Sequence, residues 1–171
     1  PIVNQQLVYY VGHGDITPVG DIARFEADRV VFADGRSAEA DLVVFCTGYL
    51  VAFPFLPDAQ ELLNWQGDHP RLALQIFTPT SPSLFVSGLI QPDSGQWTLA
   101  HWQGMTIARY IEAQRTDPVR AERFRREVLA EAGRTFSGGA EYKDSSRHYY
   151  EVAHQEYLAR LEGAVHRLEA A

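Results

Sequence analysis

"ADLVVFCTGYLVAFPFL", residues 40–56, places a charged residue before an apolar run that ends in Thr47-Gly48-Tyr49. Runs of this kind are typical of a strand buried inside a parallel sheet, with a ligand bound beyond the carboxyl end of the strand. The stretch therefore predicts an α/β fold in which residues 41–46 form a core strand and residues 47–49 approach a ligand.

Shorter strands are predicted before this run. Residues 7–11 are apolar and lie before a glycine-rich turn, and residues 22–25 and 29–32 are two short β-prone runs. The sequence Ala33-Asp34-Gly35-Arg36 is typical of a hairpin turn. Together with residues 41–46, these runs predict an antiparallel meander whose last strand enters the core.

The following region predicts one more strand and one long helix. Residues 58–83 contain Pro70, Pro79 and Pro82, which argue against any long element. Residues 83–87 predict a second buried strand that ends at Gly88. A helix is predicted over residues 98–114, and its expected apolar face consists of Leu99, Trp102, Met105, Ala108 and Ile111.

Two further helices are predicted near the carboxyl end. Asp117 and Pro118 have the residue types of an N-cap and a first helical position, and Gly133 is expected to end that helix. Residues 134–147 predict a loop, and residues 149–170 a third helix with Glu156 and Arg160 as a surface pair. The inward side chains expected there are Val152, Leu158, Leu161, Val165 and Leu168.

Composition limits the possible partners. The 171 residues carry a net charge of −7 and one cysteine, Cys46. An acidic chain is not expected to bind nucleic acid or an anionic membrane. The sequence contains no C-x-x-C pair, no apolar run of about 20 residues and no signal-peptide pattern at its start. We therefore expect a cytoplasmic protein with no membrane or nucleic-acid partner.

Familiar catalytic motifs are absent from the sequence. Gly12-x-Gly14 follows an apolar run, but Thr17 and Pro18 replace the rest of a dinucleotide fingerprint and no helical period follows. No H-E-x-x-H or G-x-S-x-G occurs. The residues thus predict no metal site and no catalytic acid, base or nucleophile.

Two glycines at predicted strand ends are the candidate ligand contacts. Gly48 and Gly88 lack side chains, so backbone there can approach a flat cofactor closely. After Gly88 comes a helix whose free N–H groups, near Thr98 and Leu99, carry partial positive charge that would favour an electron-rich ring. The alternative, that both glycines only form tight turns, explains the same residues equally well.

Several motifs resemble those of the flavin-containing monooxygenases. Residues 31–35, VFADG, and 41–49, DLVVFCTGY, resemble the "FEDG" and "D-x-V-I-F-A-T-G-Y" segments of that family. Residues 53–56 continue the match, and residues 88–92, GLIQP, with Gln103-Gly104 resemble its "GLIQP…LQG" segment. The T-G-Y motif also occurs in N-hydroxylating monooxygenases, so GLIQP carries most of the specificity. Cys46, where the family has alanine, is interpreted as a small buried replacement.

The resemblance implies the fold and the cofactors. It implies the C-terminal part of a flavoprotein fold that binds both FAD and NADPH, with residues 1–114 returning to the FAD domain and residues 115–171 forming a helical extension. The family's FAD and NADPH fingerprints do not occur in these residues. The contacts implied for the cofactor are Thr47, Gly48, Tyr49, Gly88, Leu89, Gln91, Thr98 and Leu99.

The resemblance also implies an activity. In that family, NADPH reduces FAD, and the reduced flavin carries oxygen from O2 to a soft nitrogen or sulfur atom of a small-molecule substrate. Trp97, His101 and Trp102 would shape a pocket, and the 171 residues alone would be inactive. Alternatives are a small non-catalytic binding module that reuses half of a flavin fold, or part of an N-hydroxylating or Baeyer–Villiger monooxygenase. A homodimer that covers apolar surface is also plausible.

Overall fold

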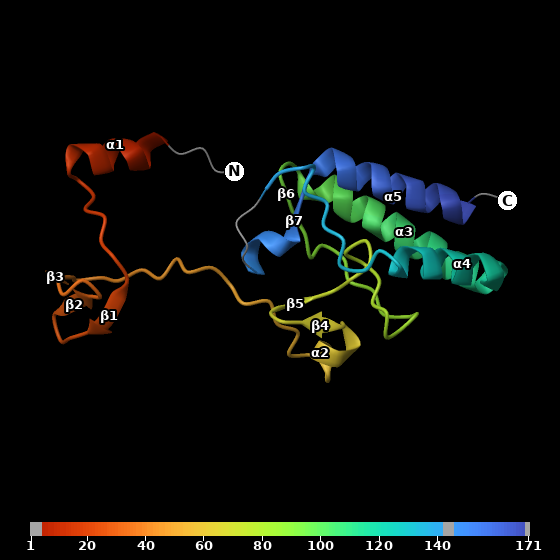
Figure 1. The fold of residues 1–171 in the computed structure, drawn as a ribbon, viewed down its shortest axis with the longest axis horizontal. Helices are drawn as coiled ribbons and strands as arrows, with labels where there is room; N and C mark the ends of the chain where they lie inside the picture. Colours follow the sequence, from red (N-terminus) through yellow and green to blue (C-terminus); the bar gives the residue numbers. More distant parts are fainter. Residues whose placement is uncertain (1–4, 142–145, 170–171) are drawn as a thin grey trace. The chain divides into compact units, whose positions relative to one another are not determined.

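The chain has a mixed α/β structure made of two compact units (Figure 1). The computed structural model describes residues 5–141 and 146–169, and the units comprise Pro1–Leu50 and Val51–Ala171. The division expected after residue 114 stays a prediction about a larger flavoprotein. In this structure, residue 114 lies inside a helix of the second unit, and helices from both sides of it pack together.

The first unit begins with a helix where the sequence predicted a strand. Helix α1 spans Gln5–His13 and has no buried side chain. No strand among the described residues pairs with it, so the backbone satisfies its hydrogen bonds locally, as a helix does. The helix is followed by Gly14 at φ 85°, a left-handed conformation that commonly ends helices. The prediction of a strand over residues 7–11 was wrong.

A three-stranded antiparallel sheet forms the rest of the first unit. Its strands are β1 (Ile22–Phe25), β2 (Arg29–Phe32) and β3 (Ser37–Glu39), in the order β1-β2-β3. The predicted hairpin turn is confirmed, because Gly35 has φ 85° and β2 pairs with β3 across it. The Asp34 carboxylate accepts hydrogen bonds from the backbone N–H and the guanidinium of Arg36, which lower the pKa of Asp34.

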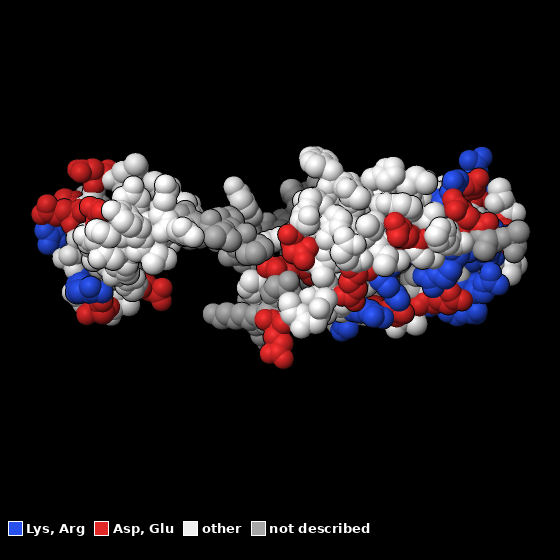
Figure 2. Space-filling model, turned by 90° about the horizontal axis from the view of Figure 1, so that it is seen from above, with Lys and Arg blue, Asp and Glu red and all other residues white. Residues whose placement is uncertain are grey.

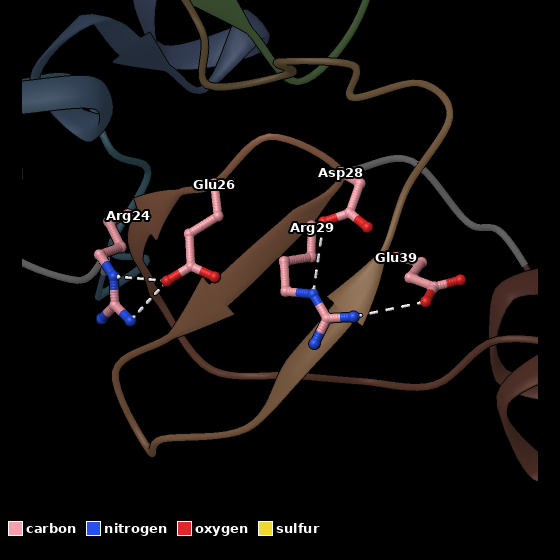
Figure 3. Close-up of polar contacts among 5 residues, drawn as sticks. All are labelled: Arg24, Glu26, Asp28, Arg29 and Glu39. Carbon is pink, nitrogen blue, oxygen red and sulfur yellow. Dashed lines mark hydrogen bonds and ion pairs between the residues drawn. The ribbon is translucent and has the colours of Figure 1, made fainter.

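Exposed ion pairs flank this sheet (Figure 3). The Arg29 guanidinium lies 3.5 Å from Asp28 and 3.4 Å from Glu39, which is its partner residue on β3. Arg24 pairs with Glu26 at 2.7 Å. Ion pairs in such exposed positions each contribute little to stability, about 0–1 kcal/mol. The buried side chains of β2, Val30, Val31 and Phe32, hold the sheet together more effectively.

Residues 41–46 do not form the expected core strand. The third member of the meander is β3, and residues 42–50 have no regular secondary structure. The side chains of Leu42, Val44 and Phe45 are 79%, 70% and 66% exposed, and Cys46 is exposed as well. A parallel strand is buried by neighbours on both sides, and none of the described strands pairs with these residues. The reading of Cys46 as a buried packing residue was therefore also wrong.

The second unit begins with short elements. They are α2 (Ala59–Leu62), β4 (Trp65–Gln66) and β5 (His69–Pro70), so the prediction that residues 58–83 hold no long element is confirmed. The strand predicted over residues 83–87 is absent. Only Phe85 forms an isolated bridge, to Phe77, because its neighbour is an irregular segment rather than a sheet.

Three helices build the core of the second unit: α3 (Gln96–Thr116), α4 (Pro118–Leu129) and α5 (His154–Glu169). Figure 1 shows α5 running beside α3. The predicted helix at α3 is confirmed, but its buried face shares only Leu99 with the predicted face. The predicted members Ala108 and Ile111 are exposed. The stripe that packs inward consists of Leu99, Gln103, Thr106, Tyr110 and Ala113.

Helix α4 follows the prediction closely at its start. The Asp117 carboxylate accepts a hydrogen bond from the Arg120 N–H at 3.0 Å, so Asp117 is the N-cap. The helix ends at Leu129, before the predicted Gly133. Gly133 instead turns the chain with φ 81°, and its N–H donates to the Leu72 carbonyl at 3.1 Å. The predicted loop follows over the described residues 134–141, and its remainder to residue 145 lies outside the described residues.

Helix α5 begins later than predicted. A 3₁₀ turn, η1 (Ser146–Tyr150), and a short strand, β7 (Glu151–Val152), precede it. Strand β7 pairs in parallel with β6 (Gln91–Pro92), which keeps Val152 out of the helix. Leu161, Val165 and Leu168 are buried as predicted, and Leu158 is partly buried.

The predicted surface pair of α5 was wrong. Glu156 accepts a hydrogen bond from the Gly138 N–H at 2.8 Å, while Arg160 pairs with Glu131. Both partners come from the segment between α4 and α5, so the charges of this helix join α5 to that segment rather than to each other.

We predict that Gly133→Ala destabilises the second unit by roughly 1–3 kcal/mol, because an alanine there would adopt a strained left-handed backbone. Its Cβ would also lie 2.4 Å from Nε of Arg71. Urea unfolding of the variant measures the loss. The control is Gly163→Ala, inside α5 with no atom within 4 Å of the added Cβ, which should gain up to about 1 kcal/mol. Equal stabilities for the two variants would contradict the expectation.

Candidate functional site

The loop from Gly88 to Gln91 is fixed by two glutamine side chains of α3. The Gly88 carbonyl accepts a hydrogen bond from Nε2 of Gln96 at 2.9 Å. The Gly88 N–H donates to Oε1 of Gln103 at 2.8 Å. The two glutamines are two helical turns apart, so they lie on the same side of α3. Both backbone polar groups of Gly88 are therefore occupied from the side of the helix.

The space that a side chain on Gly88 would enter is open. The φ of Gly88 is 80°, and a Cβ built on it would meet only Nε2 of Gln96, at 3.8 Å. A glycine in this conformation lets a flat ligand approach the backbone, which a side chain would prevent. The left-handed φ is also what a tight turn requires, so both roles proposed for this glycine are consistent with the geometry.

A buried hydrogen-bond relay continues inward from Gly88. Nε2 of Gln103 donates to the Tyr157 hydroxyl at 2.7 Å, and that hydroxyl donates to the Leu74 carbonyl at 2.7 Å. Gln103 and Tyr157 are both 0% exposed. The relay joins the Gly88 loop, α3, α5 and the bend at Leu74, which has φ 50°.

Tyr157 is chemically suited to the centre of this relay. Burial raises the pKa of its phenol, and the hydrogen bond from Gln103 lowers it by less. The hydroxyl therefore keeps its proton at neutral pH and can donate it to Leu74.

Neither relay residue is predicted as part of a site from the sequence. Gln103 belonged to the "LQG" motif but was not assigned a role. Tyr157 was omitted from the inward face of the last helix, although it lies one turn before Leu161. The only signal in the sequence that could have identified them is a polar side chain on the apolar face of a predicted helix.

The far end of the loop is tied to the start of α5. Strand β6 pairs with β7, and the Asp93 N–H donates to the Val152 carbonyl at 3.2 Å. The Asp93 carboxylate in turn accepts a hydrogen bond from the His154 N–H at 2.9 Å, as an N-cap does. Residues 88–93 are thus held at both ends by contacts with α3 and with the segment that leads into α5.

The predicted cofactor contacts fall into both units. Gly88, Leu89, Gln91 and Thr98 lie in the second unit, where Leu89 is half-buried and Gln91 and Thr98 are exposed. The side chain of Leu99 is fully buried in the core, and the expected contact through the backbone N–H groups near Thr98 and Leu99 stays a prediction. Thr47, Gly48 and Tyr49 lie in the first unit without regular structure, and Tyr49 is fully exposed. Their role as cofactor contacts stays a prediction.

The aromatic residues suggested for a pocket differ in exposure. Trp97 is 88% exposed on the first turn of α3, and His101 is also exposed. Trp102 is partly buried and packs against the core. Trp97 and His101 are therefore free to contact a ligand, whereas Trp102 mainly fills the helical interface.

Charged side chains are interspersed over the helical unit (Figure 2). Basic and acidic groups alternate over the visible face, and many of them pair. Arg109 lies 2.7 Å from Glu169 of α5, and Arg167 lies 3.3 Å from Glu127 of α4. Among the described residues, no three His, Cys, Asp or Glu side chains gather as metal ligands. No helix of the described part is long and apolar enough to cross a membrane.

We predict that Tyr157 contributes to a loss of stability at alkaline pH. An unfolded tyrosine loses its proton near pH 10, but the raised pKa of Tyr157 means that the folded chain holds this proton at higher pH. Because the folded state then binds more protons, the free energy of unfolding falls as pH rises above about 10. Tyr157→Phe should make that fall shallower, by up to about 1.4 kcal/mol per pH unit.

Urea unfolding at several values between pH 8 and pH 12 measures this slope. Tyr110, Tyr149 and Tyr150 also have raised pKa values, to about 12 for Tyr150, so a residual fall is expected in the variant. Tyr49→Phe, at a fully exposed tyrosine, is the control. The same slope in wild type and Tyr157→Phe would show that this phenol does not contribute.

Comparisons of this chain with known proteins indicate one family. A family model described as flavin-binding monooxygenase-like matches residues 1–165. Flavin-containing monooxygenase 5 of Rattus norvegicus is 30% identical over 152 residues, which are 86% of this chain and 27% of the relative. No solved structure matches the chain significantly.

A second group of relatives matches a shorter region more strongly. The 4-hydroxybenzoate brominases (decarboxylating) of Marinomonas mediterranea and Pseudoalteromonas luteoviolacea are 38% and 40% identical over 94 residues, 54% of this chain and 17% of each relative. The chain thus spans about a quarter or less of the length of these relatives. Since the family match covers nearly all of its residues, the chain belongs to the flavin-binding monooxygenase-like family.

Proposed function

We propose that this chain is the C-terminal portion of an FAD- and NADPH-dependent monooxygenase that oxygenates soft nitrogen or sulfur centres. The family match over residues 1–165 supports a flavin monooxygenase. The relatives named flavin-containing monooxygenase and dimethylaniline monooxygenase (N-oxide-forming) support oxygen transfer to nitrogen. In this proposal, the flavin supplies the redox chemistry, and the residues of this chain position it.

The observation that carries the proposal is the half-open Gly88 loop. Hydrogen bonds with Gln96 and Gln103 fix its backbone, and the space that a Cβ on Gly88 would enter holds only Nε2 of Gln96, at 3.8 Å. A glycine with such open surroundings allows a ligand to approach the backbone. The first turn of α3, which begins at Gln96, follows closely in the sequence, and its free N–H groups favour negative charge. These features suit the isoalloxazine of FAD, and none of them requires an acid or a base from this chain.

The first unit would contribute the connection between nucleotide-binding regions. Gly48 has φ 81°, and a Cβ built on it would meet no atom within 4 Å outside its own chain neighbours. Residues 47–49 would then join the NADPH side to the flavin side. The exposed apolar side chains of Leu42, Val44 and Phe45 would be covered by neighbouring strands of a larger sheet.

We predict that the 171-residue chain alone binds FAD weakly or not at all and oxidises no NADPH. Its residues include no dinucleotide fingerprint with the strand–loop–helix context that holds a pyrophosphate. Absorbance near 450 nm after gel filtration with excess FAD measures the bound flavin. One flavin per chain would overturn the proposal that these residues are inactive alone.

We also predict that Gly88→Ala weakens FAD binding about tenfold in protein made from the complete reading frame that encodes these residues. The alanine would strain the left-handed backbone of Gly88 and fill the space beside its Cα, and tenfold corresponds to about 1.4 kcal/mol. The matched control is Gly67→Ala, which has a similar φ of 67° and open surroundings. Equal affinities for the two variants would show that FAD does not lie against Gly88.

The second candidate is a decarboxylating bromination of a hydroxybenzoate. The 38–40% identity to two brominases over 94 residues favours it, because this is higher than the identity to flavin-containing monooxygenase 5. NADPH-dependent assays of the complete protein decide between the candidates. A tertiary amine or a thioether would give an oxide in the first case, and 4-hydroxybenzoate with bromide would give a bromophenol in the second.

A further inference from the structure

We propose that Gln103 and Tyr157 are positioning residues that hold the Gly88–Gln91 loop in its ligand-facing conformation, so that helix α5 supports the candidate site from behind. This inference rests on the proposed function for its link to flavin, but its geometric part concerns the loop alone. Neither residue would touch the cofactor, because both are fully buried.

The relay permits only one arrangement of its hydrogen bonds. The Gly88 N–H can only donate, so Oε1 of Gln103 must face it. The amide nitrogen of Gln103 then faces Tyr157, and the phenol proton must go to the Leu74 carbonyl, which can only accept. A relay with a single consistent set of directions fixes both the rotamer of Gln103 and the position of the Gly88 backbone.

The anchor of the relay is itself well held. The ring of Tyr157 packs against the ring of Phe136, with 5.0 Å between the ring centroids. Helix α5 packs mainly against α3. Leu74 and Gln75 both have positive φ, 50° and 52°, so the carbonyl that receives the phenol proton lies on a bend with a restricted conformation. The loop is thus connected through Tyr157 to helix α5 and to the bend at Leu74.

Among the described residues, no group other than the Gln103 amide accepts a hydrogen bond from the Gly88 N–H. The Ser87 hydroxyl also donates to Oε1 of Gln103, at 3.3 Å, so it depends on the same amide. Loss of the Gln103 amide would leave the Gly88 N–H without a partner, and loss of the phenol would leave Nε2 of Gln103 unpaired in the core. Both changes should release the loop.

The test measures hydrogen exchange at the Gly88 amide in the full 171-residue chain. The variants are Gln103→Met and Tyr157→Phe, which nearly conserve side-chain volume, with Leu161→Val as the control. Leu161 is equally buried and lies one turn further along α5, outside the relay. After correction for each variant's free energy of unfolding, we expect exchange at Gly88 to be at least about tenfold faster in both relay variants than in the control.

Each outcome bears on the proposal. Faster exchange in both relay variants supports it. Faster exchange in Gln103→Met alone would overturn the role of Tyr157 and α5, and equal exchange in all three variants would overturn the whole inference.

A second readout separates this inference from the proposed function. In FAD-loaded protein from the complete reading frame, the relay variants should shift the visible flavin spectrum and raise the dissociation constant for FAD, whereas Leu161→Val should change neither. If the loop is released but the flavin spectrum and affinity do not change, the relay still positions the loop, and the assignment of the loop to flavin is wrong. If the wild-type protein binds no FAD, the proposed function is wrong, but the hydrogen-exchange result still tests whether the relay holds the loop.

Discussion

The buried amide of Gln103 is the interaction on which the organisation of the second unit depends. It accepts from the Gly88 N–H and donates to Tyr157, and through Tyr157 it reaches the bend at Leu74. A buried amide left unpaired is costly, roughly 1–3 kcal/mol for each lost partner. The arrangement of α3, α5 and the Gly88 loop therefore has to satisfy this one side chain, and a shift of any of the three would leave polar groups unpaired.

The same constraint gives the C-terminal segment a role. Residues after 114 could be an appendage, but α5 supplies Tyr157, β7 pairs with β6, and His154 donates to Asp93. These contacts all reach residues 88–103, which contain the motifs that most resemble the monooxygenase family. Helix α4 completes the core through Phe124, whose ring lies 5.8 Å from that of Phe77. The helical segment is therefore part of the structure that supports the candidate site.

The first unit is stabilised in a different way from the second. Its sheet is stabilised by hairpin pairing and by the buried side chains of β2, while the apolar residues 42–45 remain largely exposed. Burial of a strand depends on the strands beside it, and the chain spans only about a quarter of the length of its curated relatives. In the proposed monooxygenase, these residues and Thr47-Gly48-Tyr49 would gain their neighbours from other parts of the fold.

The sequence by itself determined the features that depend on nearby residues. Turn and cap preferences act within a few residues, so the sequence predicts the hairpin at Gly35 and the Asp117 cap. It also predicts three helices in the C-terminal part and contains the family motifs. Only the tertiary structure decided which stripe of α3 is buried, because that stripe contains the polar residues Gln103 and Thr106, which an apolar pattern does not mark. It also decided that residues 7–11 form a helix and residues 41–46 no strand, because a strand forms only where partners satisfy its backbone. The relay from Gly88 to Leu74 joins residues far apart in the sequence, so no local pattern could have shown it.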